Sequence, residues 1–127
     1  MSLLYRWLDD DKSIMNFIFH ADFTWDSFYN VLSQAFNEIH TVNHSVDIII
    51  DLSRVRVIPV QTIKELHYLS QLEHINFRHR ILISQNPLMR EVFHAFVRSY
   101  PQSSRSLYLC ETMEVAHHFI NLPTLLP

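Results

Sequence analysis

Apolar and polar residues follow two periods along this chain, and these periods predict strands and helices in a regular order. Two aromatic and apolar segments, residues 3–8 and 14–20, flank the polar run 9–12 and predict two strands joined by a turn. Thr24 is a typical helix N-cap. Apolar residues then recur at intervals of three and four as far as Ile39, which predicts a helix of about four turns.

The rest of the chain repeats the pattern of a strand followed by a helix. The predicted strands are residues 46–52, 80–85 and 106–110, and the helices that follow them begin near Pro59, Asn86 and Thr112. Pro59 and Pro87 suit the first turn of a helix, where a missing amide proton costs nothing. Asn86 supplies the cap before Pro87.

This order of elements predicts an α/β fold. We expect a single domain over residues 1–127, with a core at about 3–120 and an extended tail at 121–127. A mostly parallel sheet of about five strands, mixed at the N-terminal hairpin, would carry four helices. If successive strands are neighbours, right-handed crossovers place the helices on one face.

Alternation along the strands predicts which side chains face those helices. One side collects Phe17, Phe19, Val46, Ile48, Ile50, Ile81, Ile83, Leu107 and Leu109. The opposite side carries an apolar band of four residues, Ile18, Ile49, Leu82 and Tyr108. Such a band needs cover from the N-terminal hairpin, the tail or a second subunit. We predict that it is the contact face of a homodimer.

Composition narrows the class of protein. The chain has 127 residues, of which 48% are hydrophobic, enough for one core. The formal net charge of -3 argues against nucleic acid as a partner. One cysteine, Cys110, cannot form an intrachain disulfide, and neither a secretory leader nor a membrane-spanning run is recognisable. These features predict a cytoplasmic protein that does not insert into membranes.

The absence of glycine removes several kinds of active site. Phosphate-binding loops, dinucleotide fingerprints and nucleophile elbows need glycine for close backbone approach or positive φ. Asp47, Asp51 and Ser53 beside a histidine could form a hydrolytic set, but its tight turn is harder to build here. His40 and His44 have metal-ligand spacing without a third ligand. We therefore expect no enzyme activity, no cofactor and no metal.

The loop at 53–58 follows a predicted parallel strand, and ligands of open α/β sheets bind at such strand ends. Arginine is suited to anions, and the helix that follows presents free amides. The predicted ligand or partner site comprises Ser53, Arg54, Arg56, Gln61, Thr62 and Asn86. The alternative is a solvated loop whose two valines pack inward.

The strand at 46–51, the run Asp51-Leu52-Ser53-Arg54-Val55 with Ile58, and the order of elements from about 14 to 120 resemble a STAS-type domain. This family, also called SpoIIAA-like, includes the bacterial anti-sigma-factor antagonists. Its regulatory members carry an Asp-Ser-Ser-Gly type sequence whose serine is phosphorylated by a partner kinase. Here the matching stretch is Pro59-Val60-Gln61-Thr62, so the phosphoswitch does not carry over.

The resemblance implies a non-enzymatic binding or regulatory module that acts through a protein partner. STAS domains are also similar in shape to CRAL-TRIO lipid-binding domains. That similarity implies an alternative function, the carriage of a small apolar or lipid-like ligand. A hydrolytic enzyme is the third alternative.

Overall fold

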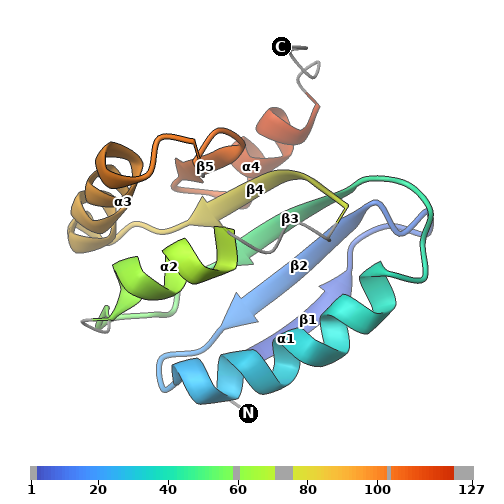
Figure 1. Ribbon diagram of the computed structural model, residues 1–127, viewed down its shortest axis with the longest axis horizontal. Coiled ribbons are helices and arrows are strands. Elements are labelled where there is room, and N and C mark those ends of the chain that lie inside the picture. Colours follow the sequence, from blue (N-terminus) through green and yellow to red (C-terminus); the bar gives the residue numbers. More distant parts are fainter. Residues whose placement is uncertain (1–2, 59–60, 71–75, 103, 122–127) are drawn as a thin grey trace.

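The computed structural model describes residues 3–58, 61–70, 76–102 and 104–121 (Figure 1). Its elements follow the predicted order of strands and helices. They are β1 (Leu3–Trp7), β2 (Ile14–Phe19), α1 (Trp25–Ile39), β3 (Val46–Asp51), α2 (Thr62–Ser70), β4 (Phe77–Ile83), α3 (Pro87–Ser99), β5 (Leu107–Cys110) and α4 (Met113–Ile120).

The five strands form one sheet in the order β1-β2-β3-β4-β5. β1 and β2 pair antiparallel, with Tyr5 opposite Phe17, and β2 to β5 are parallel. The fold class is therefore α/β with a mostly parallel sheet, as predicted. Within the described residues, no helix combines the length and apolarity needed to cross a membrane.

Polar side chains begin three of the helices, as the sequence predicts. The Thr24 hydroxyl accepts from the Ser27 amide at 3.1 Å, and Thr112 caps α4 in the same way through the Val115 amide at 3.2 Å. Asn86 caps α3 by accepting from the Leu88 amide at 2.9 Å. In each case a first-turn amide without a helical partner is satisfied. Pro59, expected in the first turn of α2, lies outside the described residues.

The hairpin between β1 and β2 closes without glycine. Lys12 takes the left-handed conformation at φ 55°. Asp9 holds the turn by accepting from the backbone amides of Ser13 and Ile14, at 3.0 and 3.1 Å, and from the Ser13 hydroxyl. Partial burial raises the pKa of Asp9, but these hydrogen bonds outweigh it, so the pKa lies below its ordinary value of 3.8.

We expect Asp9→Ala to destabilise the protein by about 1 kcal/mol at neutral pH, since it removes these hydrogen bonds. A carboxyl whose pKa is lowered by folding stabilises the folded state above its unfolded pKa, and this contribution is lost as pH falls through the folded pKa. The difference between wild type and variant should therefore shrink below pH 3.8. Urea unfolding at neutral and acid pH measures it, and a pH-independent difference would contradict it.

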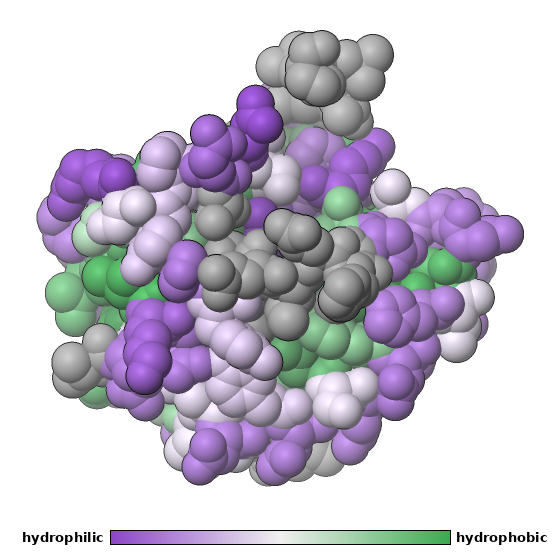
Figure 2. Space-filling view, viewed as in Figure 1, coloured by the Kyte–Doolittle hydropathy of each residue, from purple (hydrophilic) through white to green (hydrophobic). Residues whose placement is uncertain are grey.

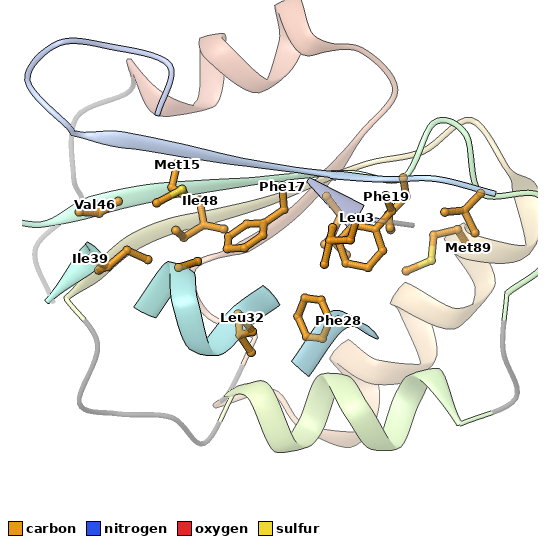
Figure 3. Packing of buried hydrophobic residues seen from close by; sticks show 14 residues of the cluster. Leu3, Met15, Phe17, Phe19, Phe28, Leu32, Ile39, Val46, Ile48 and Met89 are labelled. Carbon is orange, nitrogen blue, oxygen red and sulfur yellow. The ribbon is translucent and has the colours of Figure 1, made fainter. Parts of the chain in front are cut away.

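The helices occupy both faces of the sheet. Figure 3 shows α1, α2 and α3 on one side of the strands and α4 on the other. The larger apolar cluster lies on the three-helix side and includes Phe17, Ile48 and Leu82. A second cluster on the α4 side joins Ile49, Ile81 and Ile83 to α4 through Ala116 and Ile120. The expectation that all helices share one face is correct for the three crossover helices and wrong for α4.

The predicted orientation of β4 is also wrong. Ile81 and Ile83 face α4, and Leu82 belongs to the three-helix side. Ile48 pairs with Arg80 and Ile50 with Leu82 in a register that shifts between Val46 and Ile48. The run of three apolar residues in β4 is buried on both faces. Alternation therefore does not indicate which face of β4 packs against the three helices and which against α4.

The predicted dimer face therefore does not exist as one uncovered surface. Ile49 is 0% exposed beneath α4, and Leu82 is 1% exposed on the opposite face of the sheet. Tyr108 stacks on Phe119 of α4, with ring centroids 4.9 Å apart. Ile18 alone is half-buried without a place in either cluster. The homodimer was predicted from this face, so the prediction no longer has a surface to support it.

The hairpin between β1 and β2 covers part of the α4 side of the sheet. Leu8 and Ile14 pack against the second cluster, as one of the alternatives for covering this face required. The tail at 122–127 lies outside the described residues. The main cover is α4, which no sequence argument placed on this side.

Candidate functional site

The carboxyl ends of the parallel strands meet at one edge of the sheet, on the left of Figure 1. There β2 ends at Phe19, β3 at Asp51, β4 at Ile83 and β5 at Cys110. Open α/β sheets bind their ligands at this edge because loops from several strands converge there.

Asp51 organises the loop that follows β3. Its carboxylate accepts from the Ser53 amide at 2.9 Å, a turn that aspartate commonly forms. The Leu52 amide donates to the carbonyl of Ile83 at 2.8 Å and continues the pairing with β4 by one residue. Val55 is buried beneath the loop, whereas Val57 is 76% exposed. Only one of the two valines packs inward, so the solvated-loop alternative is half correct.

Four of the predicted site residues come together around this loop. The Arg54 guanidinium lies 3.4 Å from Nδ1 of His20, and Ser53 Oγ lies 3.5 Å from Nε2 of Gln85. Asn86, while capping α3, donates through Nδ2 to the carbonyl of Arg56 at 3.3 Å. This bond ties the loop to the start of α3.

We call Arg54, Arg56, Val57, Asn86 and Leu88 the rim. Leu88 is 53% exposed and lies two residues after Asn86 in the sequence. Val57 directly follows Arg56. Figure 2 shows apolar surface on the left, where α3 begins. Sequence reasoning missed Val57 and Leu88 as surface residues, because the hydrophobicity of a residue does not reveal whether the fold buries it.

Gln61 and Thr62 do not join the rim in the same way. Gln61 is exposed and its carbonyl accepts from the Glu65 amide at 3.0 Å in the first turn of α2. Thr62 is only 6% exposed and lines an apolar cavity between the sheet and the helices. Thr62 was predicted to belong to the ligand or partner site, but it is buried and does not lie at the surface with the other residues of that site.

Burial of Thr62 predicts that no kinase modifies it in the folded protein. A kinase needs the hydroxyl and the flanking backbone in its own active site, and Thr62 begins a helix with its side chain inside. Phosphopeptide mapping of protein from its natural host should find no phosphate on Thr62. A stoichiometric phosphate there would contradict this expectation.

The rim carries two guanidinium groups, those of Arg54 and Arg56. Arg90 pairs with Glu111 at 3.3 Å, and Asp51 is engaged by the Ser53 amide. Within the described residues, neither Arg54 nor Arg56 forms an ion pair. The surface therefore combines exposed aliphatic side chains with two guanidinium groups.

A buried polar network lies away from this edge, near the start of β3. The Asp47 carboxylate is 4% exposed and accepts from Arg78 Nε and Nη2, at 3.1 and 2.8 Å, and from the His79 amide at 3.0 Å. Nδ1 of His79 also lies 3.0 Å from it. Arg78 Nη2 donates in addition to the carbonyl of Ile120 at 3.0 Å, which ties down the end of α4. The hydrogen bonds with Asp47 raise the pKa of Arg78 against the lowering effect of burial.

Sequence reasoning missed this network because it began β4 at Arg80. The strand begins at Phe77, so Arg78 and His79 lie within the sheet beside Asp47. The network could have been predicted from one feature of the sequence, the carboxylate of Asp47 inside the apolar run 46–50. Such a group requires a cation or several donors from a neighbouring strand.

The imagined hydrolytic set is not assembled. Asp47 and Asp51 are four residues apart on β3, about 13 Å at the usual rise of a strand. Ser53 lies near Asp51 at one end of β3. The histidine beside Asp47, His79, is buried at the other end of this strand.

The two histidines with metal-ligand spacing lie at the end of α1 and just beyond it. His40 is exposed at the end of α1, and both ring nitrogens of His44 lie 3.1 Å from backbone carbonyls of Ser45 and Asp11. Among the described residues, no three histidine, cysteine or acidic side chains are grouped to hold a metal.

Comparison with known proteins adds no family to these observations. The chain matches no protein-family model, no curated protein and no solved structure.

Proposed function

We propose that this protein is a non-enzymatic binding or regulatory module of the STAS-like type, and that it binds an acidic, amphipathic segment of a partner protein at the rim. The observation that carries the proposal is the exposure of Val57, 76%, and of Leu88, 53%, on a loop and a helix start that the Asn86–Arg56 hydrogen bond joins. Arg54 and Arg56 of the same rim form no ion pair within the described residues. Exposed apolar patches that polar residues surround are typical of protein interaction sites.

The chemistry of the rim selects the partner. Val57 and Leu88 offer apolar contacts, and burying each would contribute to affinity in proportion to the area removed from water. Arg54 and Arg56 present guanidinium groups that pair with carboxylates in bidentate geometry. A segment with apolar residues on one side and acidic residues at its border complements both features.

The loop is suited to recognition because it is held from beneath. Val55 packs in the core cluster, the Asp51 carboxylate accepts from the Ser53 amide, and Asn86 anchors Arg56. A backbone held at several points loses little conformational freedom on binding. This arrangement supports a preformed docking surface.

The alternative of a lipid carrier receives less support. The cavities between the sheet and helices α1 to α3 have volumes of about 40 and 50 Å³. Pockets for drug-sized ligands are typically about 300–1,000 Å³. An acyl chain would require the core to open, so we do not propose a lipid ligand.

A peptide-display selection against the wild-type protein tests the proposed function. We expect enriched peptides to combine acidic and large apolar residues and to bind with dissociation constants of roughly 1–100 µM, the range of small transient interfaces. Val57→Asp places a carboxylate in the apolar contact and should weaken these peptides at least about tenfold. Arg56→Glu should do the same by reversing one charge.

Val115→Asp is the matched control. Val115 is 41% exposed on α4, on the other face of the sheet, so this variant makes the same chemical change away from the rim. It should bind the selected peptides as wild type does. Enrichment of basic peptides, or equal binding by Val57→Asp and wild type, would overturn the proposal.

A further inference from the structure

Helices α3 and α4 leave neighbouring strands toward opposite faces of the sheet. α3 follows β4 on the three-helix side, and α4 follows β5 on the other side (Figure 3). Open α/β sheets bind ligands where the connections after two adjacent strands diverge in this way, because a crevice opens between the strand ends. This topology predicts a crevice at the carboxyl ends of β4 and β5.

A hollow of about 210 Å³ lies at this position. It is bordered by Ser84, which follows β4, by Cys110 and Glu111 at the end of β5, and by Arg90 and Phe93 of α3. Phe93 packs against the larger apolar cluster, whereas Cys110 belongs to the second one. The hollow therefore lies between the two faces of the sheet, as the topology predicts.

Two opposite charges meet at the outer part of the hollow. Arg90 Nη2 lies 3.3 Å from Glu111 Oε1, and the two side chains are 56% and 66% exposed. Exposed ion pairs contribute little to stability, so a ligand can separate these two groups at low cost. Both the guanidinium and the carboxylate are accessible to a molecule in the hollow.

The deeper part of the lining is apolar. Phe93 and Leu109 are half-buried, and Cys110 is 7% exposed. Burial raises the pKa of the Cys110 thiol, so it stays protonated at neutral pH and packs as a small apolar group. The remaining titratable side chain of the lining, His94, is exposed. The hollow thus combines an apolar floor with one positive and one negative group above it.

We propose that this hollow binds a free amino acid with an aliphatic side chain, such as leucine. Its carboxylate would pair with Arg90, its ammonium group with Glu111, and its side chain would contact Phe93 and Leu109. The inference goes beyond the partner-binding role of the rim and does not depend on it.

The paired charges of the site select a zwitterion. Glu111 repels a simple anion that Arg90 attracts, and Arg90 repels a simple cation that Glu111 attracts. The carboxylate and ammonium groups of an α-amino acid share one carbon, which suits two protein groups only 3.3 Å apart. The volume is below the roughly 300–1,000 Å³ of pockets for drug-sized ligands, as is appropriate for so small a molecule.

Titration of the ¹⁵N-labelled protein with L-leucine, followed by ¹H–¹⁵N NMR, tests this proposal. The backbone amide signals of Arg90, His94 and Glu111 should shift saturably, with a dissociation constant of roughly 0.1–10 mM, as expected for a ligand of this size. Signals of α1, which does not border the hollow, should stay in place. The absence of a saturable shift would overturn the proposal.

Three analogues test the separate contacts. Isocaproate lacks the ammonium group of leucine, isoamylamine lacks its carboxylate, and glycine lacks its side chain. Each should bind at least about tenfold more weakly than leucine. An analogue that binds as tightly as leucine would show that the contact it lacks does not exist, and the assignment of a zwitterion with an apolar side chain would be wrong.

Variants of the two charged residues test which group meets which charge. Glu111→Gln should weaken leucine at least about fivefold and strengthen isocaproate, because the repulsion of its carboxylate is removed. Arg90→Gln should weaken leucine by a similar factor and strengthen isoamylamine. Both side chains are exposed, so both variants should fold.

Arg98→Gln and Glu114→Gln are the matched controls. They make the same chemical changes at exposed positions of α3 and α4 outside the lining of the hollow. Both should bind leucine as wild type does. Equal leucine affinity for wild type, Glu111→Gln and Arg90→Gln would overturn the proposal, as would an equal loss of affinity in the control variants.

Discussion

Asp47→Ala is expected to destabilise the folded protein by about 3 kcal/mol. The substitution leaves the backbone amide and ring of His79 buried without their acceptor and removes the partner of Arg78. Breaking a buried pair from one side usually costs about 3–5 kcal/mol. We expect the lower end because the Arg78 side chain is 38% exposed and water partly replaces the lost contact.

Urea unfolding followed by circular dichroism measures this effect. Asp51→Ala is the matched control, because Asp51 lies on the same strand but is less buried, and among the described residues it accepts from the Ser53 amide alone. It should cost no more than about 1 kcal/mol. A loss below about 1 kcal/mol for Asp47→Ala would show that Arg78 and His79 find other partners at little cost.

Ile49→Ala combined with Leu82→Ala is expected to unfold most of the protein rather than dissociate a dimer. Each residue is essentially unexposed, and truncating a buried isoleucine or leucine to alanine costs about 2–5 kcal/mol. The two side chains lie on opposite faces of the sheet, so their costs should roughly add. The total approaches the whole stability of a small domain, about 5–15 kcal/mol.

The single variants separate this expectation from the dimer hypothesis. Each should lower the urea midpoint without changing the sedimentation coefficient of the folded species. Val57→Ala, at a position that is 76% exposed, should change stability by less than about 0.5 kcal/mol. A double variant that stays folded and sediments as a monomer beside a dimeric wild type would contradict the packing described here.

The order and type of the elements could be predicted from local chemistry. Helix α1 has its apolar residues at intervals of three and four after a threonine cap, and α3 begins with asparagine followed by proline. These preferences depend on a few neighbouring residues, so they are visible in the sequence. The position of the rim could be predicted in the same way, because the order of the elements defines where each parallel strand ends.

Local chemistry could not orient β4 or place α4. The Ile81-Leu82-Ile83 run is apolar on both faces, so neither face is marked as the inner one. Right-handed crossovers constrain α1, α2 and α3, each of which joins two parallel strands. Helix α4 follows the last strand and joins nothing after it within the sheet, so no such rule applied to it.

By itself, then, the sequence determined the α/β class, the helix caps, the Asp51 turn and the meeting of Ser53, Arg54, Arg56 and Asn86 at one edge. These features arise from contacts within a few residues or from strand order. The tertiary structure alone decided which apolar residues were left outside, which face α4 covers, and that Asp47 is paired with Arg78 and His79. Those outcomes depend on the register between strands and on burial by segments distant in the chain, which no local pattern encodes.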